Sequence, residues 1–286
     1  MGFMYQTTDT AWKAEVLQRA QISREQVLDE VERRLGVHLN RDVQTSGNRN
    51  PSIGMPTRCR TWIRVNWYEP DKIFPWELSG LEASLAITGV PRPEFIQACH
   101  WTHSGIIFRA EQMTLADERI ASPRSLPSQL PDVDEQWWED LSQALRNLSQ
   151  VKTNRISLPP TPIKREIKEF TGLELDTRIS DWVTGHGDLH WASLTAPRLH
   201  ILDWECWGRL PRGADAATLW ASAFCAPELA KEVQRRFHDD LSSRDGRICK
   251  LWISYKISHA DIERTHGPEH LERLRSVQTE LIESPS

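Results

Sequence analysis

The sequence predicts an α+β fold with two lobes, a small strand-rich N-lobe and a larger helical C-lobe. Residues 37–68 alternate apolar and polar side chains between Gly, Asn and Pro residues, which is typical of short antiparallel strands joined by turns. Residues 122–136 are rich in Pro and Ser, as expected of a connecting segment. Beyond this segment, apolar side chains recur mainly at helical spacing. The predicted parts are an N-terminal helical segment (1–36), the N-lobe (37–113), a hinge or linker (114–134) and the C-lobe (135–286).

The first elements follow from apolar spacing and from turn residues. Apolar residues over 9–35 recur at helical spacing, and Ser23 predicts a capping box where this pattern restarts. Residues 76–89 also have helical spacing and end in glycine, which predicts a second helix. The stretch 95–113 predicts two strands joined by a turn that contains Gly105.

Most of the C-lobe is predicted to be helical. One segment, HGDLHWASLTAPRLHILDWE (186–205), interrupts the helices, and we expect it to form a loop followed by a hairpin with its turn at 195–198. The predicted helices cover 134–151, 161–172, 213–241, 246–266 and 268–284.

Composition restricts the class of protein. The 286 residues carry a net charge of −5, with 39% hydrophobic and 26% charged residues, which fits a folded protein without a general attraction to nucleic acid. No apolar run reaches the roughly 20 residues of a membrane-spanning helix, and the N-terminus lacks a signal-peptide pattern. The five cysteines form no C-x-x-C motif, so we expect a cytoplasmic protein without a disulfide framework. Most of the 13 tryptophans are expected in the core.

Two aspartates carry the chemistry that we expect of the C-lobe. Asp188 lies in the polar loop HGDLHWAS (186–193), and Asp203 follows the apolar strand LHIL (199–202). In a hairpin built from these segments, both carboxylates lie near the open end. Such a pair can divide two tasks: one carboxylate accepts a proton from an attacking hydroxyl group, and the other holds Mg²⁺ on nucleotide phosphates. The pattern therefore predicts phosphoryl transfer.

The motifs around these aspartates resemble those of the aminoglycoside phosphotransferase-like kinases, whose motifs are related to those of protein kinases. The family's catalytic loop reads H-G-D, four residues and Asn, and its metal motif reads I-D-W/F-E/G after a strand; HGDLHWAS (186–193) and LDWE (202–205) stand in these places. The segment CWGRLPRGADAATLW (206–220) is similar to the family's G-x-x-x-x-D-x-A. The resemblance is strong across 182–222. It implies a bilobal protein-kinase-like fold with ATP and one or two Mg²⁺ between the lobes.

The resemblance also implies an activity and roles for residues of the C-lobe. The γ-phosphate of ATP is expected to move to a hydroxyl group of a small molecule or to a peptide Ser/Thr, in a resistance or natural-product context. Asp188 is the expected catalytic base, and His186 is expected to brace its loop by hydrogen bonding. Asp203 is the expected Mg²⁺ ligand, and Asp215 supports the same region. Ser193 stands where the family has a metal-binding Asn, and its hydroxyl group is the expected second metal ligand.

The same resemblance implies nucleotide-binding residues in the N-lobe. Arg64 stands where the family has lysine, and we expect it to bind the α- and β-phosphates. Its expected ion-pair partner is Glu82, with Glu77 as the second choice. Gly47 and Asn48 belong to an expected loop over the phosphates, and the ring of Trp62 is expected to stack on adenine. Glu111 belongs to an expected hinge (108–113) whose backbone holds adenine.

Two alternatives stay open at this level. The substitutions at Arg64 and Ser193 also fit a pseudokinase-type scaffold that binds a nucleotide or a protein partner with little or no turnover. The pattern His186-x-Asp188-x-His190 places three ligand-type side chains on one face of an extended segment, which would suit Zn²⁺ and hydrolysis. The zinc alternative leaves the LHILDWE segment unexplained.

Overall fold

The computed structural model describes residues 17–43, 45–46, 52–70, 79–156 and 161–259, together with four single positions nearer the C-terminus. Several predicted features lie outside these residues: the start of the first helix (9–16), the phosphate loop with Gly47 and Asn48, Glu77, and most of the helix over 268–284.

The chain divides into two compact units. Described residues up to Leu85, together with Pro93–Asp117, form the N-terminal unit. Ala86–Arg92 and the described residues from Glu118 onward form the C-terminal unit. Among the helices of the described ranges, none is long and apolar enough to cross a membrane.

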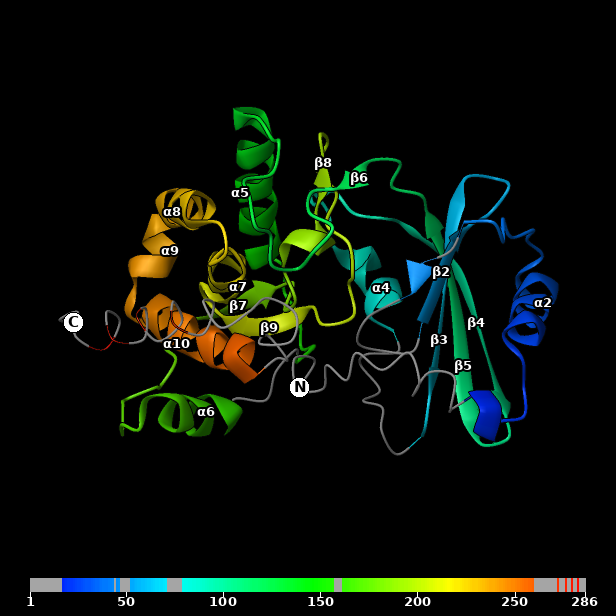
Figure 1. Ribbon diagram of the computed structural model, residues 1–286, viewed down its shortest axis with the longest axis horizontal. Coiled ribbons are helices and arrows are strands. Elements are labelled where there is room, and N and C mark those ends of the chain that lie inside the picture. Colours follow the sequence, from blue (N-terminus) through cyan, green and yellow to red (C-terminus); the bar gives the residue numbers. More distant parts are fainter. Residues whose placement is uncertain are drawn as a thin grey trace. The chain divides into compact units, whose positions relative to one another are not determined.

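An antiparallel sheet, with five strands in the described part of the chain, is the basis of the N-terminal unit (Figure 1). The strands are β1 (Thr45–Ser46), β2 (Ser52–Pro56), β3 (Thr61–Tyr68), β4 (Phe95–His103) and β5 (Ile106–Thr114). Their order is β1-β2-β3-β5-β4, so β3 and β5 are central. β4 and β5 form the predicted hairpin, with Ser104 and Gly105 at positive φ in its turn.

The two faces of this sheet differ in character. Ile63 and Val65 of β3 belong to a buried apolar core on one face. Because side chains alternate along a strand, Arg64 lies on the opposite face together with Trp62 and Asn66. One face therefore stabilises the unit, and the other presents polar and charged groups.

Helix α2 (Arg24–Leu35) covers the apolar face. It begins at the predicted capping box, in which Ser23 and Gln26 exchange side-chain and backbone hydrogen bonds, and it ends at Gly36 in the left-handed region. Its buried stripe consists of Val27, Leu28, Val31 and Leu35. The predicted second helix is shorter than expected in its described part, where α4 (Gly80–Ala83) continues into a 3₁₀ turn, η1 (Ser84–Ala86).

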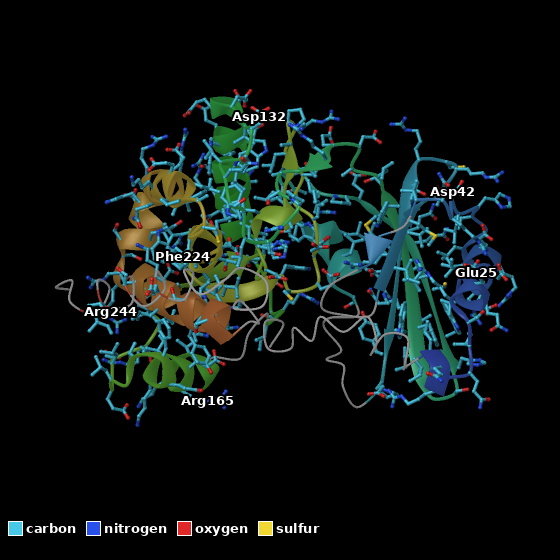
Figure 2. All side chains as sticks on the ribbon, in the orientation of Figure 1. Glu25, Asp42, Asp132, Arg165, Phe224 and Arg244 are labelled. Atoms are coloured by element: carbon cyan, nitrogen blue, oxygen red, sulfur yellow. The ribbon has the colours of Figure 1, made fainter. Side chains whose placement is uncertain are left out.

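The C-terminal unit is mainly helical, as predicted. Two short strand pairs lie within it: β7 (Trp182–Gly185) pairs with β9 (Gly208–Pro211), and β6 (Arg119–Ile120) pairs with β8 (Thr195–Ala196). β6 falls inside the stretch expected to be a linker. The α-helices of its continuously described part are α5 (Glu135–Ser149), α6 (Thr161–Thr171), α7 (Ala214–Ser222), α8 (Pro227–Arg236), α9 (His238–Ser242) and α10 (Arg244–His259). Figure 2 shows Phe224 among these helices and Arg165 at the surface on α6.

Three tryptophans pack together at the centre of the C-terminal unit. Trp137 and Trp138 of α5 both lie against Trp191, with ring centroids 6.3 Å and 5.8 Å from it. Trp137 donates its indole N–H to the carbonyl oxygen of Thr195 (2.8 Å), and Trp191 donates to that of Leu219 in α7 (3.1 Å). These buried rings tie α5 and α7 to the segment that runs from β7 to β8, which is the segment of the predicted catalytic loop.

Candidate functional site

The predicted catalytic loop begins directly after β7 and is held by Asp215 in the first turn of α7. The Asp215 carboxylate accepts hydrogen bonds from the backbone N–H groups of His186 (2.6 Å) and Gly187 (2.9 Å). Gly185 leaves room for this carboxylate, because a Cβ atom there would lie 2.6 Å from Asp215 Oδ2. Gly187 has a φ of 83°, which favours glycine. Burial raises the pKa of Asp215. The predicted supporting contact of Asp215 is therefore present.

His186 links this loop to the segment that carries Asp203. The imidazole is fully buried, and its two ring nitrogens have different partners. Nε2 lies 2.7 Å from the carbonyl oxygen of Leu202, which can only accept, so Nε2 carries the proton and donates. Nδ1 accepts the backbone N–H of Asp188 (3.3 Å). One ring therefore joins the backbone of Asp188 to the residue immediately before Asp203.

The predicted hairpin is present between these two segments. Thr195 donates its N–H to the carbonyl oxygen of His200 (3.1 Å), and Leu202 donates to that of Ser193 (2.8 Å). Asp203 follows directly, with an exposed side chain and a φ of 64°. Left-handed backbone is uncommon for a residue other than glycine, and such residues cluster at functional sites.

Trp204 completes the contact between the two motifs. Its ring is buried and meets the His186 ring edge-on, with centroids 5.1 Å apart and an interplanar angle of 83°. Its indole N–H donates to the carbonyl oxygen of Ile201 (2.7 Å). The aromatic residue of the D-W-E motif thus packs on the histidine of the H-G-D motif, while the adjacent Asp203 stays exposed.

Ser193 is buried, and its hydroxyl group takes part in the turn that follows Asp188. The hydroxyl group donates to the carbonyl oxygen of His190 (2.7 Å) and accepts the N–H of the same residue (3.1 Å). A hydroxyl group has one proton and two lone pairs, so these two bonds leave one lone pair. Ser193 stays a predicted metal ligand, with a hydroxyl group already engaged by the backbone.

The donor atoms at this site suit a hard cation. The two candidate carboxylates and the Ser193 hydroxyl group supply oxygen ligands, which Mg²⁺ prefers. Zinc binding by the His186-x-Asp188-x-His190 pattern fits poorly, because both ring nitrogens of His186 already form hydrogen bonds within the protein. Across the residues that the structure describes, no group of three or more His, Cys, Asp or Glu side chains is arranged to hold a metal ion.

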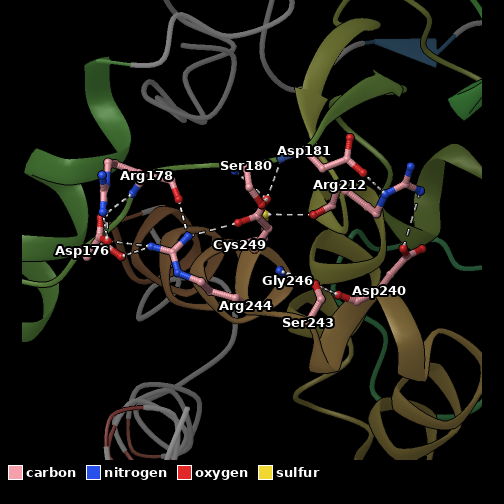
Figure 3. Close-up of polar contacts among 11 residues, drawn as sticks. Asp176, Arg178, Ser180, Asp181, Arg212, Asp240, Ser243, Arg244, Gly246 and Cys249 are labelled. Atoms are coloured by element: carbon pink, nitrogen blue, oxygen red, sulfur yellow. Dashed lines mark hydrogen bonds and ion pairs between the residues drawn. The ribbon is translucent and has the colours of Figure 1, made fainter.

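The strand that leads into the catalytic loop is anchored by α10 (Figure 3). Asp245 in the first turn of α10 is buried, and its Oδ2 accepts the N–H and the hydroxyl group of Ser180 and the N–H of Asp181, each at 2.8 Å. Asp181 in turn pairs with Arg212, which follows β9 (2.5 Å). These contacts determine where β7 begins, and hence the position of the loop that follows it.

In the N-terminal unit, the predicted ion pair between Arg64 and Glu82 is replaced by another arrangement. Arg64 donates to Glu111 (2.9 Å), which is buried in the sheet. Glu82 instead accepts a hydrogen bond from Arg109 (2.8 Å). Arg109 also contacts Glu111 (3.1 Å), so this carboxylate lies between two guanidinium groups. The prediction of an Arg64–Glu82 pair is therefore wrong, because Glu111 is directly opposite Arg64 in the sheet.

The location expected for the adenine-binding hinge also needs correction. The stretch 108–113 lies inside β5, with β3 on one side and β4 on the other. A backbone within a central strand is engaged in the hydrogen bonds of the sheet, so it is not free to hold adenine. Glu111 contributes a buried carboxylate rather than hinge backbone. Trp62 lies on the same face as Arg64 and is half-buried.

Sequence reasoning missed two anchors of the site. One is Asp245, and the other is Arg155, whose guanidinium group donates to the carbonyl oxygens of Glu205 and Trp207. Both contact segments that are 50 or more residues away along the chain. Neither belongs to a local motif, so spacing and composition contain no signal for them. The buried position of Asp245 is not evident either, because an acidic residue in the first turn of a helix is ordinary.

No family model matches the sequence, and no curated protein matches it. Solved structures do resemble this fold. Aminoglycoside phosphotransferase APH(4)-Ia aligns with a TM-score of 0.61 and 11% identity, covering 90% of this chain and 99% of that chain. The fold is protein-kinase-like. This agrees with the expectation from the motifs.

Two further structures share the likeness. Amicoumacin kinase hAmiN, in complex with AMP-PNP, Ca²⁺ and Ami, aligns with a TM-score of 0.60 and 12% identity, covering 94% of this chain and 95% of that chain. The macrolide 2′-phosphotransferase MphH from Brachybacterium faecium aligns with a TM-score of 0.50 and 15% identity, covering 91% of this chain and 99% of that chain. At these identities the likeness establishes the architecture.

Proposed function

We propose that this protein transfers the γ-phosphate of ATP to a hydroxyl group of a small molecule. The observation that carries the proposal is the position of the buried His186 ring. It accepts the N–H of Asp188 and donates to the carbonyl oxygen of Leu202, so the segments of Asp188 and Asp203 share one support. Among proteins of this fold, amicoumacin kinase forms a complex with AMP-PNP and Ca²⁺, which supports a nucleotide and a divalent cation here.

Under this proposal each aspartate has one task. Asp188 accepts the proton of the acceptor hydroxyl group and orients its oxygen toward the γ-phosphate. Asp203 holds Mg²⁺, which neutralises charge on the phosphates when bound. His186 and Asp215 act on the protein alone, because they fix the backbone of the loop through the contacts described above. Ser193 as a second metal ligand, and Arg64 and Trp62 as nucleotide contacts, stay predictions.

The acceptor is proposed to be a small molecule, since the solved structures with this fold are named as kinases or phosphotransferases of small molecules. A peptide Ser/Thr is the alternative acceptor. The two are distinguished by offering [γ-³²P]ATP with an aminoglycoside and macrolide panel on one side and a Ser/Thr-rich peptide library on the other. Label in the peptide fraction alone would overturn the small-molecule acceptor.

The central experiment compares nucleotide binding and turnover in three variants. Calorimetry should show that ATP binding by the wild type depends on Mg²⁺. Asp203→Asn should lose that Mg²⁺ dependence, whereas Asp188→Asn should bind Mg·ATP normally and lose about 10²- to 10⁴-fold in the rate of ATP turnover. Asp132→Asn is the matched control, because the Asp132 side chain is 97% exposed and far along the chain from both motifs. No Mg²⁺-dependent ATP binding by the wild type would exclude the proposed function.

A pseudokinase-type scaffold is the second candidate. It is favoured by Ser193, whose hydroxyl group is engaged with the backbone of its own turn. A scaffold predicts Mg·ATP binding by the wild type, with turnover equal to that of Asp188→Asn. A difference in turnover between these two proteins would exclude it.

A further inference from the structure

We propose that Arg155 is a positioning residue that holds the backbone on the C-terminal side of Asp203 and thereby sets the affinity of Asp203 for the divalent cation. The inference rests on the proposed function for its metal-binding part. The bracing itself rests only on the contacts of Arg155. Arg155 lies after α5, outside every motif that the sequence analysis identified.

The guanidinium group of Arg155 binds the turn that follows Asp203. Its Nε donates to the carbonyl oxygen of Trp207 (2.6 Å), and one terminal nitrogen donates to that of Glu205 (2.6 Å). Residues 204–206 form a turn rather than a strand, so these carbonyl groups need donors from elsewhere. A planar guanidinium group with several fixed donors suits two carbonyl groups two residues apart.

Three further contacts hold the same segment. The Arg155 guanidinium lies over the Trp207 ring, 5.3 Å from its centroid. The backbone carbonyl of Arg155 accepts the N–H of Arg209 in β9 (2.8 Å), and Ile156 forms a parallel bridge with Arg209. Arg155 therefore fixes the chain from Glu205 to the beginning of β9 with both its side chain and its backbone.

The segment matters because Asp203 lies between two supports. On its N-terminal side, the carbonyl oxygen of Leu202 is held by His186. On its C-terminal side, Arg155 holds Glu205 and Trp207. Asp203 itself has a φ of 64°, and such a backbone persists only when the surrounding structure determines it. Releasing the C-terminal support lets Asp203 relax, and its carboxylate then loses its fixed direction.

The expected effect follows from the behaviour of groups that orient metal ligands. Loss of such a group typically lowers metal affinity about 10- to 100-fold. Arg155→Met removes both carbonyl bonds while keeping an apolar side chain over Trp207. Arg155→Lys keeps the charge but lacks the fork, so it should retain at most one of the two carbonyl bonds and give an intermediate affinity.

The matched control is Arg244→Met. Arg244 also donates to two backbone carbonyl groups, those of Asp176 and Arg178 (Figure 3). It pairs in addition with the carboxylates of Asp176 and Asp245, and these partners all lie outside 204–209. Both substitutions therefore remove carbonyl bonds, and Arg244→Met removes two ion pairs besides. General destabilisation caused by removing an arginine should appear in both variants, whereas an effect on Asp203 should appear only at Arg155.

The test has two readouts on the full chain. Without nucleotide, the backbone amides of 204–209 should exchange their hydrogens faster in Arg155→Met than in the wild type, and at wild-type rates in Arg244→Met. Unchanged exchange in Arg155→Met would overturn the bracing. Mn²⁺ titration of the ADP complex, followed by electron paramagnetic resonance, should show affinity falling about 10- to 100-fold in Arg155→Met and less in Arg155→Lys, with the affinity for metal-free ADP unchanged. A general loss of stability would lower both affinities.

The outcomes separate this inference from the proposed function. Absence of Mn²⁺ binding by the wild-type ADP complex would overturn the proposed function, and the role of Arg155 in metal affinity with it. Wild-type binding together with equal Mn²⁺ affinity in Arg155→Met would overturn the inference alone. Faster exchange across 204–209 with reduced Mn²⁺ affinity supports both.

Discussion

Replacement of His186 tests the local structure on which the candidate site depends. In His186→Phe the ring is still aromatic and can still meet the edge of Trp204, but it has no nitrogen to accept from Asp188 or to donate to Leu202. Each buried group that loses its partner costs about 1–3 kcal/mol. The bond to Leu202 is short at 2.7 Å and the bond to Asp188 is long at 3.3 Å, so the second contribution is the smaller one. We expect the free energy of unfolding to fall by about 2–5 kcal/mol.

A second variant separates hydrogen bonding from packing. The amide nitrogen of Gln can occupy the place of His Nε2 and donate to the carbonyl oxygen of Leu202, so His186→Gln should recover the larger of the two hydrogen-bond contributions. Urea unfolding measures both changes, with the m-value checked for constancy. His238→Phe is the control, because its side chain is 69% exposed and surface substitutions usually change stability by less than about 0.5 kcal/mol. Equal stability of the Phe and Gln variants, or a Phe variant as stable as wild type, would refute the reasoning.

Two further predictions concern α10. Burial lowers the pKa of Lys250 to about 8, while in the unfolded chain it stays near 10.5, so between these pH values the unfolded state binds more protons and the stability of the wild type should rise by about 1.4 kcal/mol per pH unit. Urea unfolding at pH 7, 8, 9 and 10 should show no such rise in Lys250→Met. An equal dependence of stability on pH in both proteins would contradict this role of Lys250. Gly246→Ala places a Cβ 1.8 Å from the backbone oxygen of Asp240, so it should lower the free energy of unfolding by about 3 kcal/mol, measured as a lower midpoint of thermal unfolding. Gly36→Ala, with open space but a φ of 66°, should cost only about 1–2 kcal/mol, and a smaller loss for Gly246→Ala than for Gly36→Ala would contradict this.

The hairpin and the contacts within it could be predicted because they are local. Asp188, Ser193 and Leu202 lie within 20 residues of one another, and the hydrogen bonds of this segment join residues that a single turn brings together. Turn chemistry and a short apolar strand are enough to determine such an arrangement. The same holds for α2, where the capping box and the terminal Gly36 mark both ends.

Two supports of the site, Asp245 and Arg155, were beyond sequence reasoning for a physical reason. Asp245 binds Ser180 across 65 positions, and Arg155 binds Glu205 across 50. When the partner of a charged residue is a backbone group, no complementary side chain in the sequence indicates that partner. Every residue has a carbonyl group, and nearly every residue has an N–H. Only the packed fold shows which of them meet.

The misplaced hinge has a different origin, because the resemblance implied a hinge at 108–113 while the pattern over 95–113 already predicted a strand there. Arg109 and Glu111 interrupt an apolar stretch, and charged residues are rarely buried unless they are paired. Within the sheet, β5 places Glu111 opposite Arg64, and Arg109 reaches the same carboxylate from two positions away. Two guanidinium groups around one carboxylate offset the cost of its burial, whereas a single unpaired charge would not be stable there. These paired charges are therefore the condition that allows β5 to continue through the centre of the sheet.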